Sequence, residues 1–177
     1  IDGADQWRIG KNSFPRGNYG IYANLSYKGF SANILFQGAT SRDMYIEDVV
    51  RGQSTGGYTM VYPYQLDYWM PDNTDAKFPR IAMNSSVNGN NNYVTSDFWL
   101  VNGRYIRLKS LQLGYDFRSV LLKNIKWLYK CQVVLSGQNL FTISPATKYG
   151  FDPENGSTNN YDYPMQRVYA ISLNLGF

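Results

Sequence analysis

The sequence contains no histidine and one cysteine, Cys131. Without histidine, the chain has neither a histidine-based catalytic triad nor a histidine-ligated metal site. A single cysteine excludes an intramolecular disulfide, and its apolar surroundings indicate a small hydrophobic side chain. No apolar run approaches the roughly 18 residues that a membrane helix requires. We expect a protein that is not an enzyme and that needs no metal or cofactor.

Acidic residues are also few, 13 against 17 Lys and Arg, which gives a net charge of +4. The basic residues are scattered along the sequence rather than gathered in one stripe. Nucleic acid is therefore not an expected partner.

Aromatic residues are abundant, at 16% of the 177 residues. The clearest pattern is at the carboxyl end, where large apolar side chains alternate with small or polar ones. The large residues are Tyr169, Ile171, Leu173, Leu175 and Phe177. A period of two predicts a β-strand with one apolar face. That pattern fits a soluble β-sandwich with a buried core, and it equally fits a transmembrane barrel with its apolar face toward lipid.

The same alternation predicts five strands, at 17–28, 29–40, 103–117, 128–142 and 166–177. Lys28-Gly29 predicts a tight hairpin turn, and residues 118–127 can form a short helical turn. The pattern also predicts that Tyr105 shares a face with Leu111 and Tyr115. The connections 41–102 and 143–165 are long, which is typical of functional loops. We expect an all-β, antiparallel chain in which residues 1–177 belong to one β-barrel domain.

Two features favour the transmembrane barrel over the sandwich. Short and long connections alternate, as periplasmic turns and extracellular loops do in outer-membrane barrels. Aromatic residues also stand at both ends of the apolar faces; a separation of eight residues spans roughly 20 Å, close to the ~25 Å apolar band of such barrels. Since about eight strands are needed to close a barrel, five strands predict a segment of a longer one.

Several motifs resemble the carboxyl-terminal part of the SusC/RagA family of TonB-linked outer-membrane transporters. They occur in the family's order and cover essentially the whole chain: Gln37-Gly38, Arg42-Asp43, residues 68–80 (YWMPDNTDAKFPR), 96–100 (SDFWL), 105–115 (YIRLKSLQLGY), 136–141 (SGQNLF), 150–154 (GFDPE) and 163–177.

The resemblance implies a barrel of about 22 strands with an amino-terminal plug, of which this chain would form the last five strands. It implies import of glycans or peptides with a SusD-like lipoprotein, driven through TonB, in the outer membrane of a Gram-negative, Bacteroidetes-type bacterium. Outer-membrane lipid and the barrel-assembly machinery are the other implied partners. Plug, TonB-contacting segment and signal peptide are missing from the sequence, so we expect a fragment of a longer polypeptide. The alternative is a stand-alone β-sandwich that binds carbohydrate through loop aromatics.

Candidate contact residues are the aromatics of the predicted extracellular loops: Tyr64, Tyr68, Trp69, Tyr149, Phe151, Tyr161 and Tyr163. Such rings stack on sugars or peptide side chains, pack on a lid protein, or order their own loops. The terminal residues Tyr169, Ile171, Leu173, Leu175 and Phe177 are expected to act as an outer-membrane assembly signal through strand pairing. The loop carboxylates lack the spacing of a twelve-residue calcium loop, and we interpret them as solvated turn residues.

Overall fold

The computed structural model describes residues 4, 6–7, 12–47, 61–81, 92, 94–155, 163 and 165–177. Chain contacts divide it into two units. The sheet unit comprises residues 17–40, 105–143 and 165–177, and the loop unit comprises residues 1–16, 41–104 and 144–164. Among the described residues, no helix has the length and apolar character needed to cross a membrane.

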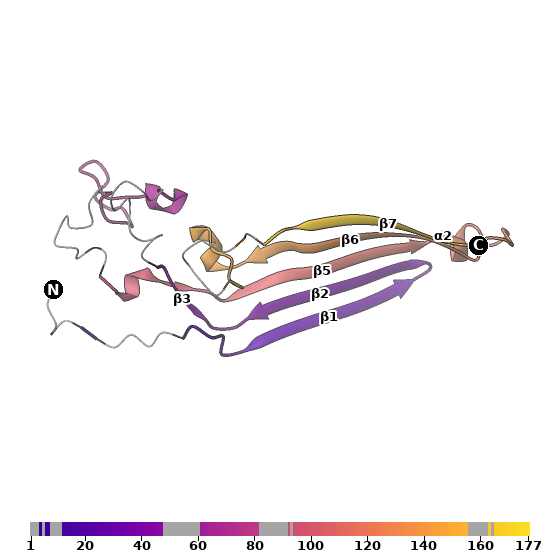
Figure 1. The fold of residues 1–177 in the computed structure, drawn as a ribbon, viewed down its shortest axis with the longest axis horizontal. Helices are drawn as coiled ribbons and strands as arrows, with labels where there is room; N and C mark the ends of the chain where they lie inside the picture. The colour runs from indigo at the N-terminus through magenta and orange to yellow at the C-terminus, as the bar shows by residue number, and fades with distance from the viewer. Residues whose placement is uncertain are drawn as a thin grey trace. The chain divides into compact units, whose positions relative to one another are not determined.

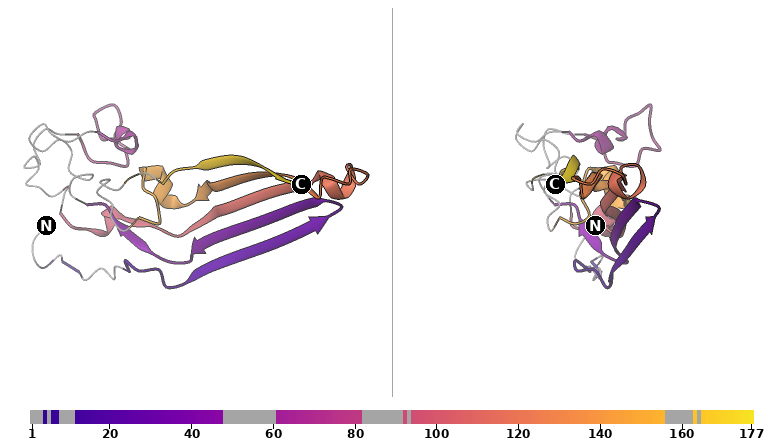
Figure 2. Two further views of the ribbon diagram at one scale, coloured as in Figure 1. Left: turned by 45° about the vertical axis from the view of Figure 1, so that its right-hand side comes forward. Right: turned by 90° about the vertical axis from the view of Figure 1, so that its right-hand side faces the viewer.

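The sheet unit is one antiparallel sheet in which the strands lie in chain order, β1-β2-β5-β6-β7 (Figures 1 and 2). The strands are β1 (Asn18–Tyr27), β2 (Phe30–Ala39), β5 (Tyr105–Asp116), β6 (Lys130–Ile143) and β7 (Val168–Gly176). Their ends differ from the predicted ranges by one or two residues. The β1–β2 turn and the β5–β6 connection lie at one end of the sheet, which we call the turn end (Figure 1).

The strand register carries the apolar alternation across the whole sheet. In one row Leu25 pairs with Ala32, Ala32 with Leu113, Leu113 with Leu135, and Leu135 with Ile171. Directly paired residues project to the same side of an antiparallel sheet. The apolar positions of the five strands therefore form one continuous surface, here called the apolar face.

The opposite side of the sheet, the polar face, carries amides and hydroxyls. Its next row runs through Asn24, Asn33, Gln112, Ser136 and Ala170. Asn33 Nδ2 donates to Gln112 Oε1 at 3.5 Å, and the Asn33 Oδ1 atom accepts from the Tyr22 hydroxyl at 3.3 Å. The two faces thus differ as the two sides of a barrel wall do.

Both residues of the β1–β2 turn have a positive φ, 44° at Lys28 and 86° at Gly29, as a two-residue hairpin turn requires. The turn lies against α2 (Phe117–Val120), the start of the β5–β6 connection. Asp116 N donates to Gly29 O at 2.8 Å, and a Cβ built on Gly29 would lie 2.6 Å from Val120 Cγ2. Asp116 also caps α2, because its side chain accepts from the Arg118 and Ser119 amides. The predicted helical turn is therefore present, but its helix ends at Val120.

A β-bulge corrects the predicted position of Tyr105. The register of β5 shifts between Leu108 and Ser110, so Lys109 is an extra residue relative to β2. Beyond the bulge Ile106 and Leu108 continue the apolar face, and Tyr105 lies on the other face from Leu111, 8% exposed. The prediction was wrong because one inserted residue inverts the period-two pattern.

The loop unit contains short elements within ranges predicted as loops. Strands β3 (Asp43–Tyr45) and β4 (Leu100–Asn102) pair antiparallel, and the 3₁₀ turns are η3 (Pro63–Leu66), η5 (Asp97–Trp99) and η6 (Pro145–Tyr149). They surround a small core that consists of Met44, Ile46, Phe78, Trp99, Val101, Ala146 and Phe151. Apolar burial therefore orders a large part of these two loops.

Candidate functional site

Six aromatic rings from distant parts of the loop unit pack together in what we call the loop aromatic cluster: Tyr62, Tyr64, Phe78, Phe98, Trp99 and Tyr149. The Tyr64 ring centroid lies 5.3 Å from those of both Phe78 and Tyr149, in edge-to-face geometry. Burial, with smaller contributions from Tyr62 and Tyr149, raises the pKa of Tyr64 well above its ordinary value. The phenol is therefore held neutral inside the cluster.

Lys77 places a positive charge at the edge of this cluster. Its Nζ donates to the Tyr149 hydroxyl at 2.6 Å and lies 4.9 Å from the centroid of the same ring. The same atom is 5.5 Å from the Phe78 ring. Lys77 therefore joins residues 76–80 to η6 through a hydrogen bond and cation–π contacts.

The structure divides the predicted contact residues into three groups. Tyr64 and Tyr149 are half-buried in the loop aromatic cluster, and Phe151 is buried in the core, so these three order their own loops. Tyr68 is half-buried and pairs with Phe78 through an isolated bridge. Trp69 and Tyr163 are exposed, whereas Tyr161 lies outside the described residues.

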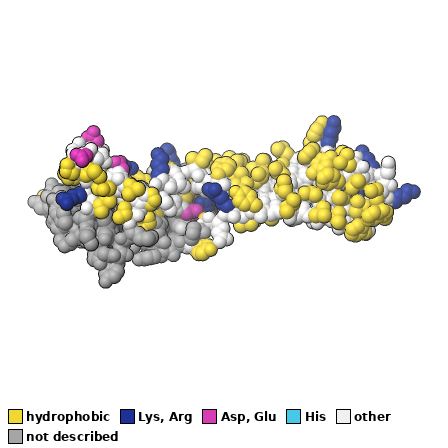
Figure 3. Space-filling view, turned by 90° about the horizontal axis from the view of Figure 1, so that it is seen from above, with side chains coloured by type: hydrophobic (Ala, Val, Ile, Leu, Met, Phe, Trp, Pro, Cys, Tyr) yellow, Lys and Arg dark blue, Asp and Glu magenta, His cyan; other side chains and the backbone are white. Residues whose placement is uncertain are grey.

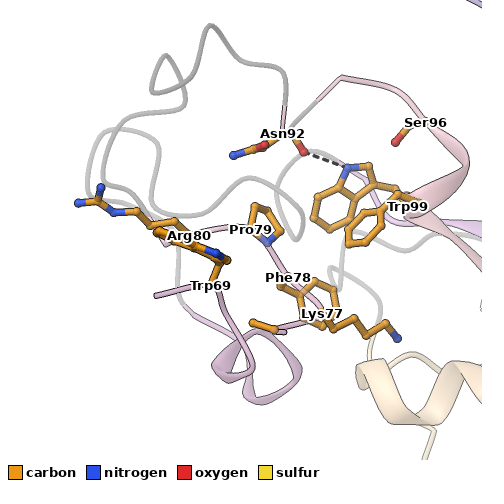
Figure 4. A pocket seen from close by; sticks show the side chains of 10 residues that line it. Trp69, Lys77, Phe78, Pro79, Arg80, Asn92, Ser96 and Trp99 are labelled. Atoms are coloured by element: carbon orange, nitrogen blue, oxygen red, sulfur yellow. Dashed lines mark hydrogen bonds between the residues drawn. The ribbon is translucent and has the colours of Figure 1, made fainter. Parts of the chain in front are cut away.

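An open groove of about 610 Å³ crosses the loop unit beside this cluster (Figure 4). Trp69 and Phe98 line it with exposed rings, while Phe78 and Trp99 are buried. The other lining residues are Ala76, Lys77, Pro79, Arg80, Asn92 and Ser96. Trp99 Nε1 donates to Asn92 O at 3.2 Å. The groove thus offers the exposed rings of Trp69 and Phe98 and the exposed cation of Arg80 to a ligand or a partner protein, while the Lys77 ammonium is engaged with Tyr149.

Sequence reasoning selected Trp69 but missed Phe98 and Arg80. Both belong to motifs that carry the family resemblance, SDFWL and KFPR. Their part in a shared groove depends on contacts between segments far apart in the chain, among them the 5.9 Å ring contact between Phe78 and Phe98. The available signal was that Phe98 and Arg80 each belong to one of these motifs. The sequence gave no distance between the two motifs.

Arg42 holds three segments of the loop unit together. Its guanidinium donates to the carbonyl oxygens of Pro153 and Asn155, the latter at 2.6 Å, and to Ser13 O at 3.1 Å. Asp43, beside it, exchanges hydrogen bonds with Asn12. The Arg-Asp pair therefore organises the start of the first long loop.

The loop carboxylates take part in local turns. Asp67 accepts from Asn73 Nδ2 and from the Lys77 amide, both at 3.3 Å, and Asp152 accepts from the Glu154 amide at 2.9 Å. Within the described part of the chain, His, Cys, Asp and Glu residues form no group of three that could hold a metal.

The apolar face of the sheet unit is an exposed hydrophobic surface, and hydrophobic side chains cover much of the sheet in the view of Figure 3. Four of the predicted assembly-signal residues belong to this face and are exposed: Tyr169, Ile171, Leu173 and Leu175. The fifth, Phe177, follows β7 and is also exposed. Exposed apolar residues also come from the other strands, including Ile21, Leu25, Leu113 and Leu135. Soluble proteins rarely leave an apolar surface of this extent uncovered.

Comparison with known proteins gives consistent relatives. No protein-family model matches the chain. Two TonB-dependent receptors of Formosa agariphila, P3 and P39, are 28% and 27% identical to it over 191 aligned positions that include the entire chain. The chain spans 18% of the length of each receptor.

Solved structures of the RagAB peptide importer share this fold. The open-open and closed-closed states match the whole of the present chain with TM-scores of 0.66 and 0.68, both at 23% identity. The match covers 19% of the importer chain in each structure. These relatives are outer-membrane proteins named as receptors and importers, which agrees with the predicted localisation. The resemblance expected from the motifs is confirmed: over its whole length, this chain is similar to part of a TonB-dependent outer-membrane receptor.

Proposed function

We propose that this chain forms the last five strands and two extracellular loops of a TonB-dependent importer of glycans or peptides. In this proposal the barrel of about 22 strands is closed by the rest of the polypeptide, which also supplies the plug and the TonB contact. The polar face lines the lumen, and the turn end lies in the periplasm. The segment performs no covalent chemistry.

The continuous exposed apolar face carries this proposal. A β-sandwich buries its apolar faces between two sheets. Here Ile171 is 73% exposed and Leu25 is 61% exposed, although both belong to an ordered row of the sheet. A lipid-facing barrel wall accounts for that exposure, whereas a stand-alone carbohydrate-binding sandwich does not.

We assign contact with substrate or with a SusD-like lipoprotein to the groove and to exposed loop aromatics, with Trp69, Phe98 and Tyr163 as its main residues. Exposed aromatic rings bring large contact area at low entropic cost. Tyr64, Tyr149 and Phe151 stabilise the loops that carry this surface, because their rings pack within the loop unit.

We also assign β7 as the strand that the barrel-assembly machinery recognises. In the described sheet β7 pairs with β6 along one edge. Its other edge can accept a further strand by backbone hydrogen bonding. In the finished barrel that edge would pair with the first strand of the polypeptide.

Mass spectrometry of the native protein from the outer-membrane fraction tests the architecture. We expect peptides of this chain in one polypeptide with plug peptides upstream of Ile1, co-purifying with a surface lipoprotein. A free 20.3-kDa species in the soluble fraction would overturn the proposal and favour the carbohydrate-binding module.

A matched pair of variants tests the groove in the full-length receptor. Trp69→Ala should reduce lipoprotein affinity, or uptake of the glycan or peptide that supports growth, because it removes a groove wall. Trp7→Ala removes an equally large exposed ring that does not line the groove. Equal effects of the two substitutions would contradict the groove assignment.

A further inference from the structure

The turn end of the sheet gathers cations that are scattered in the sequence. Lys123 and Lys126 lie in the β5–β6 connection, and Lys28 lies in the β1–β2 turn. The backbone hydrogen bond from Asp116 to Gly29 and the close approach of Gly29 to Val120 hold the two connections together. All three lysines are exposed, and Lys and Arg side chains are visible at this end in Figure 3.

Little negative charge is available at this end to neutralise them. Asp116 is the only acidic residue of the sheet unit. Its carboxylate is occupied as the cap of α2, where it accepts from two backbone amides. Arg118 is likewise engaged, since its guanidinium donates to the carbonyl oxygens of Leu122 and Leu128. The terminal carboxylate that the proposed function gives Phe177 is one further negative charge at this end (Figure 1). Three exposed lysines outnumber it, so the turn end keeps a net positive charge.

The turn end also carries exposed aromatic and aliphatic side chains. Exposed Tyr27, Leu121, Trp127, Tyr129 and Phe177 all lie at the turn end. Lys28 Nζ lies 5.2 Å from the centroid of the Tyr27 ring, so this cation is placed over an apolar-face residue. Aromatic rings with a polar edge and lysines, whose long side chains can keep the ammonium group in water, are both suited to the boundary between acyl chains and headgroups.

We propose that the turn end is a binding surface for anionic phospholipid headgroups of the periplasmic leaflet. This inference rests on the proposed function, because it requires the apolar face to be in the membrane and the turn end to be periplasmic. The lysine ammonium groups attract the phosphate of a headgroup that carries a net negative charge. Trp127, Leu121 and Tyr27 contact the upper part of the acyl chain. A zwitterionic phospholipid offers the same acyl chain without the net negative charge.

The test uses the full-length receptor in nanodiscs that contain phosphatidylglycerol and phosphatidylethanolamine in equal amounts. Native mass spectrometry after mild detergent release then measures which lipid stays bound. We expect wild type to retain phosphatidylglycerol preferentially, and Lys123→Gln with Lys126→Gln to reduce that preference by about tenfold. Higher salt should weaken the wild-type preference, since exposed charges are screened.

A charge-matched control is the double substitution Lys130→Gln with Lys148→Gln. Lys130 is close to the same turn and pairs with Gly176. The next pair, Cys131 with Leu175, lies on the apolar face, and neighbouring residues of a strand point to opposite faces. Lys130 therefore belongs to the polar face. Lys148 belongs to η6 in the loop unit. Equal loss of preference in both double variants, or no preference in wild type, would overturn the inference. A receptor absent from the outer-membrane fraction would instead contradict the proposed function.

Discussion

The indole of Trp127 stacks on the phenyl ring of Phe177, with ring centroids 5.6 Å apart and planes within 11° of parallel. The contact connects the β5–β6 connection to the residue after β7. Beside it, Tyr129 N donates to Gly176 O at 3.0 Å. Side-chain and backbone contacts therefore fix the end of β7 together.

Replacing Trp127 should weaken this attachment. Trp127→Ala is expected to lower the free energy of unfolding by about 0.5–1.5 kcal/mol beyond the lost apolar area, the usual value of an aromatic pair. Trp127→Phe should retain much of that energy. Denaturant titration of the receptor in detergent measures both, with Leu121→Ala as a control, because Leu121 is as exposed and lies in the same connection. Equal losses for Trp127→Ala and Leu121→Ala would contradict a specific stacking contribution.

Arginine substitutions on adjacent residues of β7 test which face meets lipid. Leu173 lies midway between Tyr169 and Phe177 on the apolar face, whereas Ser172 pairs with Val134 on the other face. Leu173→Arg should cost about 2–4 kcal/mol if it lies near the bilayer midplane, and Ser172→Arg should be much better tolerated. The amount of folded receptor in the outer membrane is the measurement. Similar losses for the two variants would show that the facing assignment is wrong.

Two glycines with positive φ separate backbone strain from steric contact. Gly29 has φ 86° and close neighbours, while Gly150 has φ 78° and no heavy atom within 4 Å of the position that a Cβ would occupy. Alanine at either position should cost about 1–2 kcal/mol for the left-handed backbone. Gly29→Ala should cost more, because the added methyl group meets Val120 at the turn end. Local hydrogen exchange compares the two turns; an equal increase in both would mean that the β1–β2 turn and α2 are not in firm contact.

The raised pKa of Tyr64 predicts that the free energy of unfolding of the loop unit falls at alkaline pH. Its pKa is raised in the folded state, so below about pH 10 the phenol is protonated both folded and unfolded. Above that pH the unfolded chain loses the proton first, and the free energy of unfolding falls until the folded-state pKa is reached. Thermal unfolding followed by fluorescence should show this decline in wild type and a smaller decline in Tyr64→Phe. A decline of the same slope in both would exclude Tyr64 as its source.

The strands were predictable because their side chains alternate over eight or more residues, and a period of two leaves few other structures. The same simplicity hid the bulge at Lys109. Nothing in the composition or hydrophobicity of the strand marks Lys109 as an extra residue. Only the observed strand pairing shows that Tyr105 and Leu111 lie on opposite faces. Strands β3 and β4 have three residues each, too few for any periodicity to be visible.

The candidate site was less predictable than the sheet. The sequence identified the loop aromatics as candidate contacts, but self-packing and exposure cannot be separated without distances. Tyr64 and Trp69 are close in sequence and have opposite environments, one half-buried and one lining a groove. The lysines of the turn end could not be grouped from the sequence for the same reason, since the connections that carry Lys28 and Lys123 meet only through the contact of Gly29 with α2.

The bulge in β5 also constrains how such a chain can diverge. Removing or adding one residue inside β5 would exchange side chains between the apolar face and the polar face along the remainder of the strand. In the connections between β2 and β5 and between β6 and β7, a change of one residue does not exchange the two faces. Length variation during evolution should therefore accumulate in these two connections, where new surface contacts can arise, while the wall that carries them keeps its residue count.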